Sequence, residues 1–198
     1  MRGILIMLFI ICVFAGKSDL MRNTCRAETP FPDVCADSLE MEVFRMINEY
    51  RIQHGLDPVP HSVSLTKVAK LHAVDLTKNN PDTGACNLHS WSPKGSWSPC
   101  CYTRDHRQSK CMWDKPSELT SYPGKGFEVA FYGNGGRDLP KNALTLWKGS
   151  KGHHNLLLNQ GMWRNTKFHA MGAGISGNYV CVWLGREPDP LGEPLPCR

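Results

Sequence analysis

Hydrophobic positions recur with helical spacing in two segments of the chain. Between residues 38 and 54 they fall on one face of a helix. The same spacing returns between residues 63 and 78, where His72 interrupts an otherwise apolar face. We predict a helix over each segment and interpret His72 as a buried histidine that hydrogen bonds to backbone rather than as a ligand. The apolar face of the first helix comprises Leu39, Val43, Met46, Ile47 and Tyr50.

Towards the end of the chain, the helical period gives way to the two-residue period of strands, in which successive side chains face opposite sides. Residues 170–176 and 179–184 are strand-like, and Gly177-Asn178 between them suits the positive φ angles of a tight hairpin turn. Residues 128–132 form a third strand-like run, and a helix is predicted after Asp138. Strands joined by a hairpin imply an antiparallel sheet, so we predict an α+β fold in which helices enclose a sheet.

A long stretch without either period, residues 85–130, separates these parts. It holds four of the nine cysteines and three of the six tryptophans. A loop of this length is usually functional or disordered, and its cysteine and aromatic content argues against disorder. We therefore expect disulfides to hold this stretch in place and the stretch to build a site. Its tryptophans either fill a core around the disulfides or line a groove for a ligand: Trp91, Trp97 and Trp113.

The beginning of the chain has the composition of a secretory signal peptide, with a basic start, a short apolar run and small residues at its end. We expect residues 1–18 to be this signal and the mature protein to be soluble and exported, without a transmembrane segment. The remaining chain is interpreted as one domain over residues 39–186. An irregular N-terminal arm, residues 19–38, precedes it, and a C-terminal tail, residues 187–198, follows it.

Cysteine number then predicts the cross-links. Signal removal leaves eight cysteines, and an even number in a secreted chain favours four disulfides. The adjacent pair Cys100 and Cys101 should reach two different partners. A bond from Cys197 to the arm or to the body of the domain would explain a cysteine so near the end. The eight are Cys25, Cys35, Cys86, Cys100, Cys101, Cys111, Cys181 and Cys197.

Charge narrows the range of partners. The formal net charge is +5, but the basic residues are scattered along the chain. No run of lysine and arginine resembles a nucleic-acid patch, so we expect no nucleic-acid partner.

Candidate chemistry has to be assembled from distant residues, because the chain lacks a His-Glu-x-x-His motif and paired Cys-x-x-Cys spacings. His89, Glu128 and His153 are the natural set, since two imidazoles and a carboxylate suit Zn²⁺. A hydrolytic site is the second hypothesis, because Ser90 lies beside His89 and Ser150 near His153. Alternatively, these serines cap turns and helix ends.

Several short motifs follow one another between roughly Leu39 and Gly185. They are Ile47-Asn48-Glu49-Tyr50-Arg51, Ala69-Lys70-Leu71-His72-Ala73-Val74-Asp75-Leu76, Cys86-Asn87-Leu88-His89-Ser90, Gly126-Phe127-Glu128, Trp147 with Ser150-Lys151-Gly152-His153, Met171-Gly172-Ala173-Gly174, and Tyr179-Val180-Cys181-Val182-Trp183. Their order and spacing resemble the CAP superfamily, which includes cysteine-rich secretory proteins, insect venom antigen 5 and plant pathogenesis-related proteins.

The resemblance implies an α-β-α sandwich with a three- or four-stranded antiparallel sheet. It also implies a cleft of two histidines and two acidic residues that can hold a divalent metal. By position, His89 and Glu128 match the first histidine and the first acid, and His153 matches a second histidine. Ser150 stands where the second acid is expected. The implied cleft is His89, Ser90, Glu128, Ser150 and His153, with His89, Glu128 and His153 as metal ligands.

Family members are typically secreted binders, and enzymatic roles are claimed for few of them. We therefore expect a secreted CAP-domain binding protein whose ligand is a lipid, a sterol or a protein, and we do not expect an enzyme. A secreted hydrolase that uses the same cleft and a structural extracellular protein are the alternatives.

Overall fold

The computed structural model describes residues 34–134 and 136–198. The predicted signal peptide, most of the predicted arm and Cys25 lie outside the described residues.

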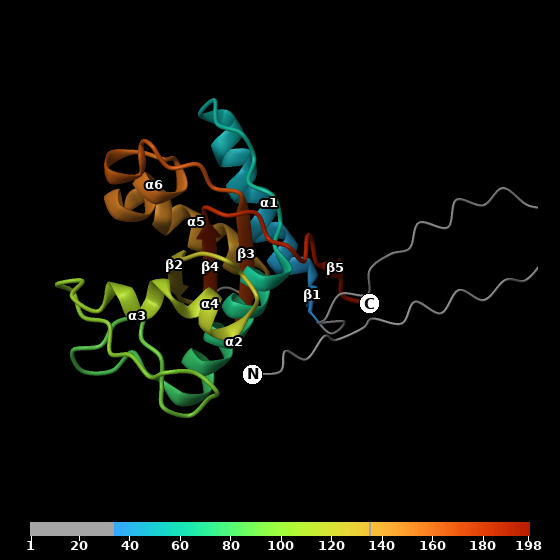
Figure 1. Cartoon of the computed structure of the whole chain (residues 1–198). Coiled ribbons are helices and arrows are strands. Elements are labelled where there is room, and N and C mark those ends of the chain that lie inside the picture. Colours follow the sequence, from blue (N-terminus) through green and yellow to red (C-terminus); the bar gives the residue numbers. More distant parts are fainter. Residues whose placement is uncertain (1–33, 135) are drawn as a thin grey trace, which may run out of the picture.

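A three-stranded antiparallel sheet lies at the centre of the described chain (Figure 1). Its order is β2 (Gly126–Tyr132), β4 (Tyr179–Gly185) and β3 (Ala170–Ser176). Helix α2 (Val63–Asn79) covers one face. The other face is covered by α1 (Ser38–Gln53) and α5 (Leu139–Gly149), with α6 (Lys151–Leu157) beside α5. The predicted α+β sandwich, its first two helices and its hairpin are confirmed.

Helix boundaries follow from their capping residues. The carboxylate of Asp37 accepts hydrogen bonds from the backbone N–H groups of Leu39 and Glu40, and Glu40 accepts one from the backbone N–H of Asp37. This reciprocal capping box satisfies N–H groups that would otherwise lack partners. At the start of α2, the backbone N–H of Leu65 donates a capping bond to the hydroxyl of Ser62, and Asn80 ends that helix with a φ of 47°. The hairpin turns at Gly177, whose φ of 55° confirms the predicted turn.

Strand β4 separates two hydrophobic cores. Its side chains alternate between the two faces of the sheet, as the period of two predicts. Val180, Val182 and Leu184 pack against the helices on the α1 and α5 side. Tyr179, Cys181 and Trp183 pack against α2 and the stretch that follows it. One strand therefore contributes to both halves of the sandwich.

Two glycines let α2 approach β3 closely. A Cβ atom on Gly172 would lie 2.1 Å from the backbone nitrogen of Thr66, and one on Gly174 would lie 2.3 Å from the backbone of Ala69. Real Cβ atoms do not approach backbone this closely. The two glycines thus fix the spacing between the helix and the sheet.

The stretch between α2 and β2 contains two short helices that no period predicted: α3 (Ser109–Trp113) and α4 (Lys115–Leu119). Trp91 and Cys100 form an isolated antiparallel bridge within it. Trp91 is buried in the core on the α2 side, and Trp97 and Trp113 pack partly buried against it. These contacts favour the core interpretation of the tryptophans.

Three disulfides are formed in the described chain: Cys35–Cys197, Cys86–Cys101 and Cys100–Cys111. The first lies beside a short parallel pairing of β1 (Cys35–Ala36) with β5 (Leu195–Pro196). The adjacent cysteines reach different partners, and Cys197 is bound to the arm, as predicted. The prediction of a disulfide at Cys181 is wrong, because its side chain is a free thiol enclosed beneath α2.

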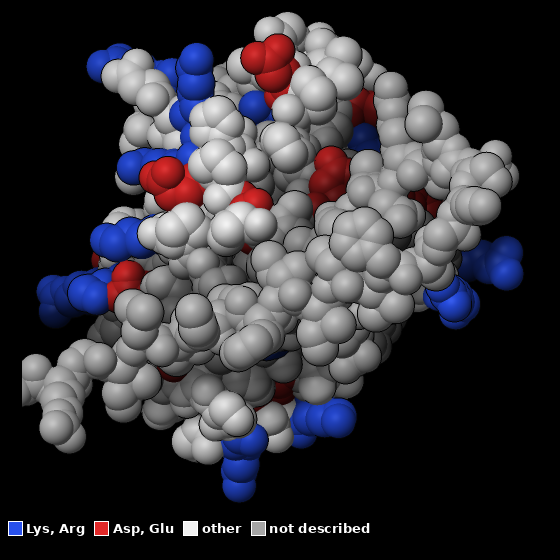
Figure 2. Space-filling view, turned by 45° about the vertical axis from the view of Figure 1, so that its right-hand side comes forward, with Lys and Arg blue, Asp and Glu red and all other residues white. Residues whose placement is uncertain are grey.

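Single-turn helices η1 (Gly136–Asp138) and η2 (Gly161–Trp163) complete the described elements. No helix in the described ranges is long and apolar enough to cross a membrane. In the face shown in Figure 2, lysine and arginine side chains project mainly along the left-hand edge, and they do not form one continuous patch.

Candidate functional site

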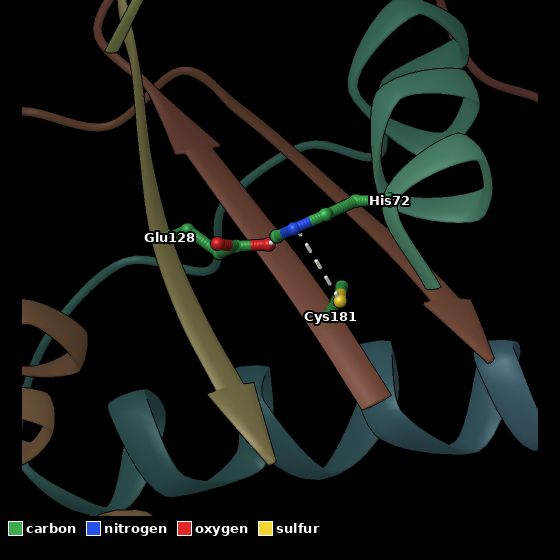
Figure 3. Close-up of side chains that lie close together, drawn as sticks. All are labelled: His72, Glu128 and Cys181. Atoms are coloured by element: carbon green, nitrogen blue, oxygen red, sulfur yellow. Dashed lines mark hydrogen bonds and ion pairs between the residues drawn. The ribbon is translucent and has the colours of Figure 1, made fainter. Parts of the chain in front are cut away.

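Glu128 is a buried carboxylate that holds two histidines. It lies on β2 between Phe127 and Val129, which face the opposite core, so its side chain points to the α2 side. Nδ1 of His72 donates to Oε1 of Glu128 at 2.6 Å, and Nδ1 of His89 donates to Oε2 at 2.8 Å. Figure 3 shows His72 and Glu128 reaching towards each other from α2 and β2, across β4. Both carboxylate oxygens are therefore engaged.

The pair of His72 and Glu128 is ionised. Nε2 of His72 donates to the backbone oxygen of Ser90 at 2.9 Å, so both ring nitrogens face acceptors and both carry protons. Burial by itself lowers the pKa of His72, but the charge of Glu128 and its hydrogen bond outweigh burial and raise that pKa. Burial would raise the pKa of Glu128, yet the two histidines hold it at about 2.

His89 lies at the edge of this pair. Its side chain is 17% exposed, and its ring meets the ring of Tyr102 edge to face at 5.3 Å. Tyr102 follows Cys101, so the disulfides of the central stretch hold the tyrosine against the histidine. In a neutral ring, donation from Nδ1 to Glu128 leaves the other nitrogen, Nε2, with a lone pair. Metal-binding histidines in proteins usually show this arrangement with a carboxylate.

His153 lies on α6, which packs beside α5. Burial and the neighbouring His89 lower its pKa to about 4, and the charge of Glu128 opposes them. The ring is therefore neutral at physiological pH. Its Nδ1 is buried and has no hydrogen-bond partner among the described residues. Ser150, the residue before α6, supplies no side-chain cap to the helix.

A second group of potential metal ligands lies deeper. Ligand atoms of His72, Glu128 and Cys181 all lie within 4.8 Å of one another, and all three residues are buried. Sγ of Cys181 is 3.8 Å from Nδ1 of His72. This group could hold a metal ion. Burial and the charge of Glu128 raise the pKa of the Cys181 thiol, so it is protonated in the metal-free protein.

Sequence reasoning named most of this site but not all of it. It brought together His89 and Glu128, and it placed His72 correctly in the interior. It missed that His72 pairs with Glu128, and it missed Cys181 and Tyr102. Within the described chain, His89, Glu128 and His153 are not among the groups whose ligand atoms all lie within 4.8 Å. A signal for His72 was present, because a glutamate inside a buried strand requires a cationic partner.

Ser90 does not line an open cleft. The residue is fully buried, and its Oγ accepts a hydrogen bond from the backbone N–H of Tyr102 at 2.9 Å. The expectation that Ser90 lines the cleft is therefore wrong. Its hydroxyl holds a turn instead, as the alternative interpretation of the serines proposed. A buried hydroxyl cannot meet a substrate as a nucleophile.

Buried histidines predict acid sensitivity. Burial lowers the pKa of His61 to about 4, where the ring stacks on Phe44 and lies 3.2 Å from Oγ1 of Thr66. As pH falls, the unfolded chain takes up a proton on His61 before the folded protein does. The contribution of neutral His61 to the free energy of unfolding is therefore fully present above about pH 6.5 and is lost as pH falls towards 4. Between about pH 7 and pH 5, His61 should reduce the free energy of unfolding by about 2 kcal/mol.

Urea unfolding of wild type and His61→Gln at these two pH values tests this prediction. The variant keeps a hydrogen-bonding side chain but does not titrate. The pH-dependent loss of stability should be smaller in the variant by about 2 kcal/mol. An equal loss in both proteins would contradict the prediction.

A three-layer sandwich with a histidine–glutamate cluster covered by a disulfide-linked stretch defines a recognisable class of domain. The model of the cysteine-rich secretory protein family, CAP, matches residues 44–182. The chain belongs to this family. No curated protein gives a significant sequence match.

Solved structures show the same fold at low identity. An extracellular protein containing an SCP domain from Bacillus anthracis is 19% identical with a TM-score of 0.53, covering 75% of this chain and 40% of that one. An outer surface protein from Borrelia burgdorferi is 17% identical with a TM-score of 0.50, covering 76% of this chain and 94% of that one. At these identities the likeness establishes the fold alone.

Proposed function

We propose that this CAP-domain protein is secreted and acts as an extracellular binding protein, and that His89 and His153 hold a divalent metal ion, with Zn²⁺ the best suited. The observation that carries the proposal is the unpaired Nδ1 of His153. A neutral, buried imidazole nitrogen without a hydrogen-bond partner is costly unless a ligand occupies it. His89 offers the second free nitrogen, because Glu128 fixes its other one.

This proposal changes the role expected for Glu128. Both of its oxygens already accept hydrogen bonds from histidines, so it orients His89 rather than binding the metal directly. The deeper group of His72, Glu128 and Cys181 is the competing position. A metal there would have to displace the proton between His72 and Glu128 and remove the thiol proton of Cys181, in a fully enclosed site. The outer position requires neither change. Zn²⁺ there would supply a Lewis acid when bound.

The organic ligand is proposed to be a lipid, a sterol or a protein. A hollow of about 630 Å³ is lined by residues of α1. That volume lies in the range of small-molecule sites. Its lining combines three apolar side chains, Met41, Phe44 and Ile52, with five polar or charged residues of the same helix. Organic extraction of the purified protein followed by mass spectrometry tests for a bound lipid or sterol.

Zinc titration of the mature protein by calorimetry tests the metal proposal. Wild type should bind one equivalent, and His89→Ala and His153→Ala should each weaken binding at least about 100-fold, because each removes a ligand. His169→Ala is the matched control, since His169 is exposed and its side chain makes no hydrogen bond in the described chain. Cys181→Ser separates the two positions, because it weakens binding at the deeper group alone.

Absence of zinc uptake by wild type would overturn the proposal. Uptake that survives His89→Ala but is lost in Cys181→Ser would move the metal to the deeper group.

A further inference from the structure

A basic hollow lies between the connection that follows α1 and the segment that joins α6 to β3. Figure 1 shows this segment in orange, running back to β3. The lining of the hollow shares no residue with the histidine–glutamate cluster. The hollow has a volume of about 480 Å³. A second hollow of about 430 Å³ adjoins it, sharing Asn165, Thr166, Lys167 and His169 and adding Arg186. We call the two together the basic hollow.

Arg51 forms its floor. This residue is only 4% exposed, yet it lines the hollow. Its Nε donates to the backbone oxygen of Asp57 at 3.1 Å, and Nη1 donates to the backbone oxygen of Leu157 and to Oδ1 of Asn159, both at 2.7 Å. All three acceptors are uncharged. Nη2 makes no hydrogen bond within the described chain and is not among its buried unpaired atoms, so it keeps contact with solvent and is free to donate at the hollow that Arg51 lines.

The rim adds cations without matching carboxylates. Arg164 and Lys167 line the first hollow, and Arg186 lines the second. None of the three forms an ion pair with a described acidic residue, although Lys70, Lys110 and Lys115 elsewhere on the chain all do. Arg186 instead lies over the ring of Phe127 at 5.0 Å. Asp57 is the acid in the lining, and Arg51 binds its backbone oxygen rather than its carboxylate.

This arrangement favours an anion. A nearly buried guanidinium whose hydrogen bonds go only to uncharged acceptors has lost hydration without forming an ion pair. Burial lowers the pKa of Arg51, and the charge of Asp57 opposes that shift. Positive groups around a concave surface also concentrate their potential within it. Arginine suits tetrahedral oxyanions, because its planar donors pair with two oxygens at once. Apolar walls from Leu56, Pro58 and Phe168 would contact the group that carries the anion.

We propose that the basic hollow binds a sulfate or phosphate group carried by a larger extracellular ligand. Nη2 of Arg51 contacts the oxyanion at the floor, and Arg164 and Lys167 close over it at the rim. The site is separate from the proposed metal position and does not depend on it.

The test is calorimetric titration of the mature protein with inorganic sulfate and inorganic phosphate, at low ionic strength and with a chelator that keeps metal sites empty. The double variant Arg164→Gln with Lys167→Gln changes exposed rim residues and leaves the buried Arg51 in place. Its affinity should fall at least about tenfold, because two charge-assisted contacts are lost. The control is Arg137→Gln with Lys141→Gln, which removes the same charge from exposed positions near α5 and should change affinity less than about twofold.

Two further arms distinguish the source of the anion. A sulfated disaccharide tests a sugar sulfate, and phosphatidylcholine vesicles with and without phosphatidic acid test a lipid phosphate. Binding in either arm that the rim variant loses would support the proposal. Failure of wild type to bind either inorganic anion would overturn it, as would equal weakening in the rim variant and the control.

Discussion

Replacing Glu128 by glutamine is expected to lower the free energy of unfolding by about 3–5 kcal/mol, because it leaves His72 buried without its counter-charge. His72 is enclosed by α2, β2 and β4, and its ring stacks on Trp91 at 4.2 Å, so water cannot replace the lost partner. The control is Glu49→Gln. Glu49 pairs with Arg45 on an exposed face of α1, where such pairs contribute less than about 1 kcal/mol.

The same variant should have a characteristic pH profile. Because the pKa of Glu128 is lowered to about 2, its contribution is fully present above about pH 4.5 and is lost as pH falls towards 2. Because the pKa of His72 is raised, its contribution is fully present below about pH 6.5 and is lost as pH rises through its folded value. The difference between wild type and variant should therefore be largest between about pH 4.5 and 6.5.

Urea unfolding across this range measures the profile. Combining His72→Phe with Glu128→Gln should cost less than the sum of the two single changes, because both remove the same pair. A difference that is independent of pH, or strictly additive losses, would show that the pair is not ionised in the folded protein.

Replacing Gly172 by alanine is expected to lower the free energy of unfolding by about 3 kcal/mol. The added Cβ would meet backbone atoms of Leu65 and Thr66 at 2.1–2.7 Å, and no side-chain rotation relieves a clash with backbone. Helix α2 would have to move off β3, which also carries His72 away from Glu128. Loss of stability should therefore be accompanied by a change at the buried pair.

Thermal unfolding with near-ultraviolet circular dichroism follows both effects, since Trp91 and Trp183 lie beside His72. Gly149→Ala is the matched control. Gly149 ends α5 with no atom within 4 Å of an added Cβ, so the change should be neutral or slightly stabilising. Equal behaviour of the two variants would contradict the close packing of α2 on β3.

Periodicity accounted for the parts of the fold in which one face is buried along a whole element. The first two helices and the β3–β4 hairpin were predicted because their apolar side chains repeat with the period of the structure they form. Within β4, Val182 packs in one core and its neighbours Cys181 and Trp183 pack in the other, as the period of two requires. Helices α3 and α4 have five residues each, which is too short for a repeat to appear.

The site was harder to predict, because pairing across the sheet leaves no periodic trace. His72 resembled any core histidine, and its partner lies 56 residues away. Cys181 was assigned to a disulfide because an even cysteine number favours complete pairing, a rule that ignores whether a partner sulfur can reach a closed core. Motif order singled out His89 and Glu128 together, and their side chains are hydrogen bonded in the structure. Their role as metal ligands stays a prediction.

The disulfide between Cys35 and Cys197 spans 162 residues. Together with the backbone it makes nearly the whole described chain a covalent ring. A single cut by a protease anywhere inside that ring opens it without releasing a fragment. After one such cleavage the two pieces of the domain stay covalently joined for as long as the disulfide between Cys35 and Cys197 is intact.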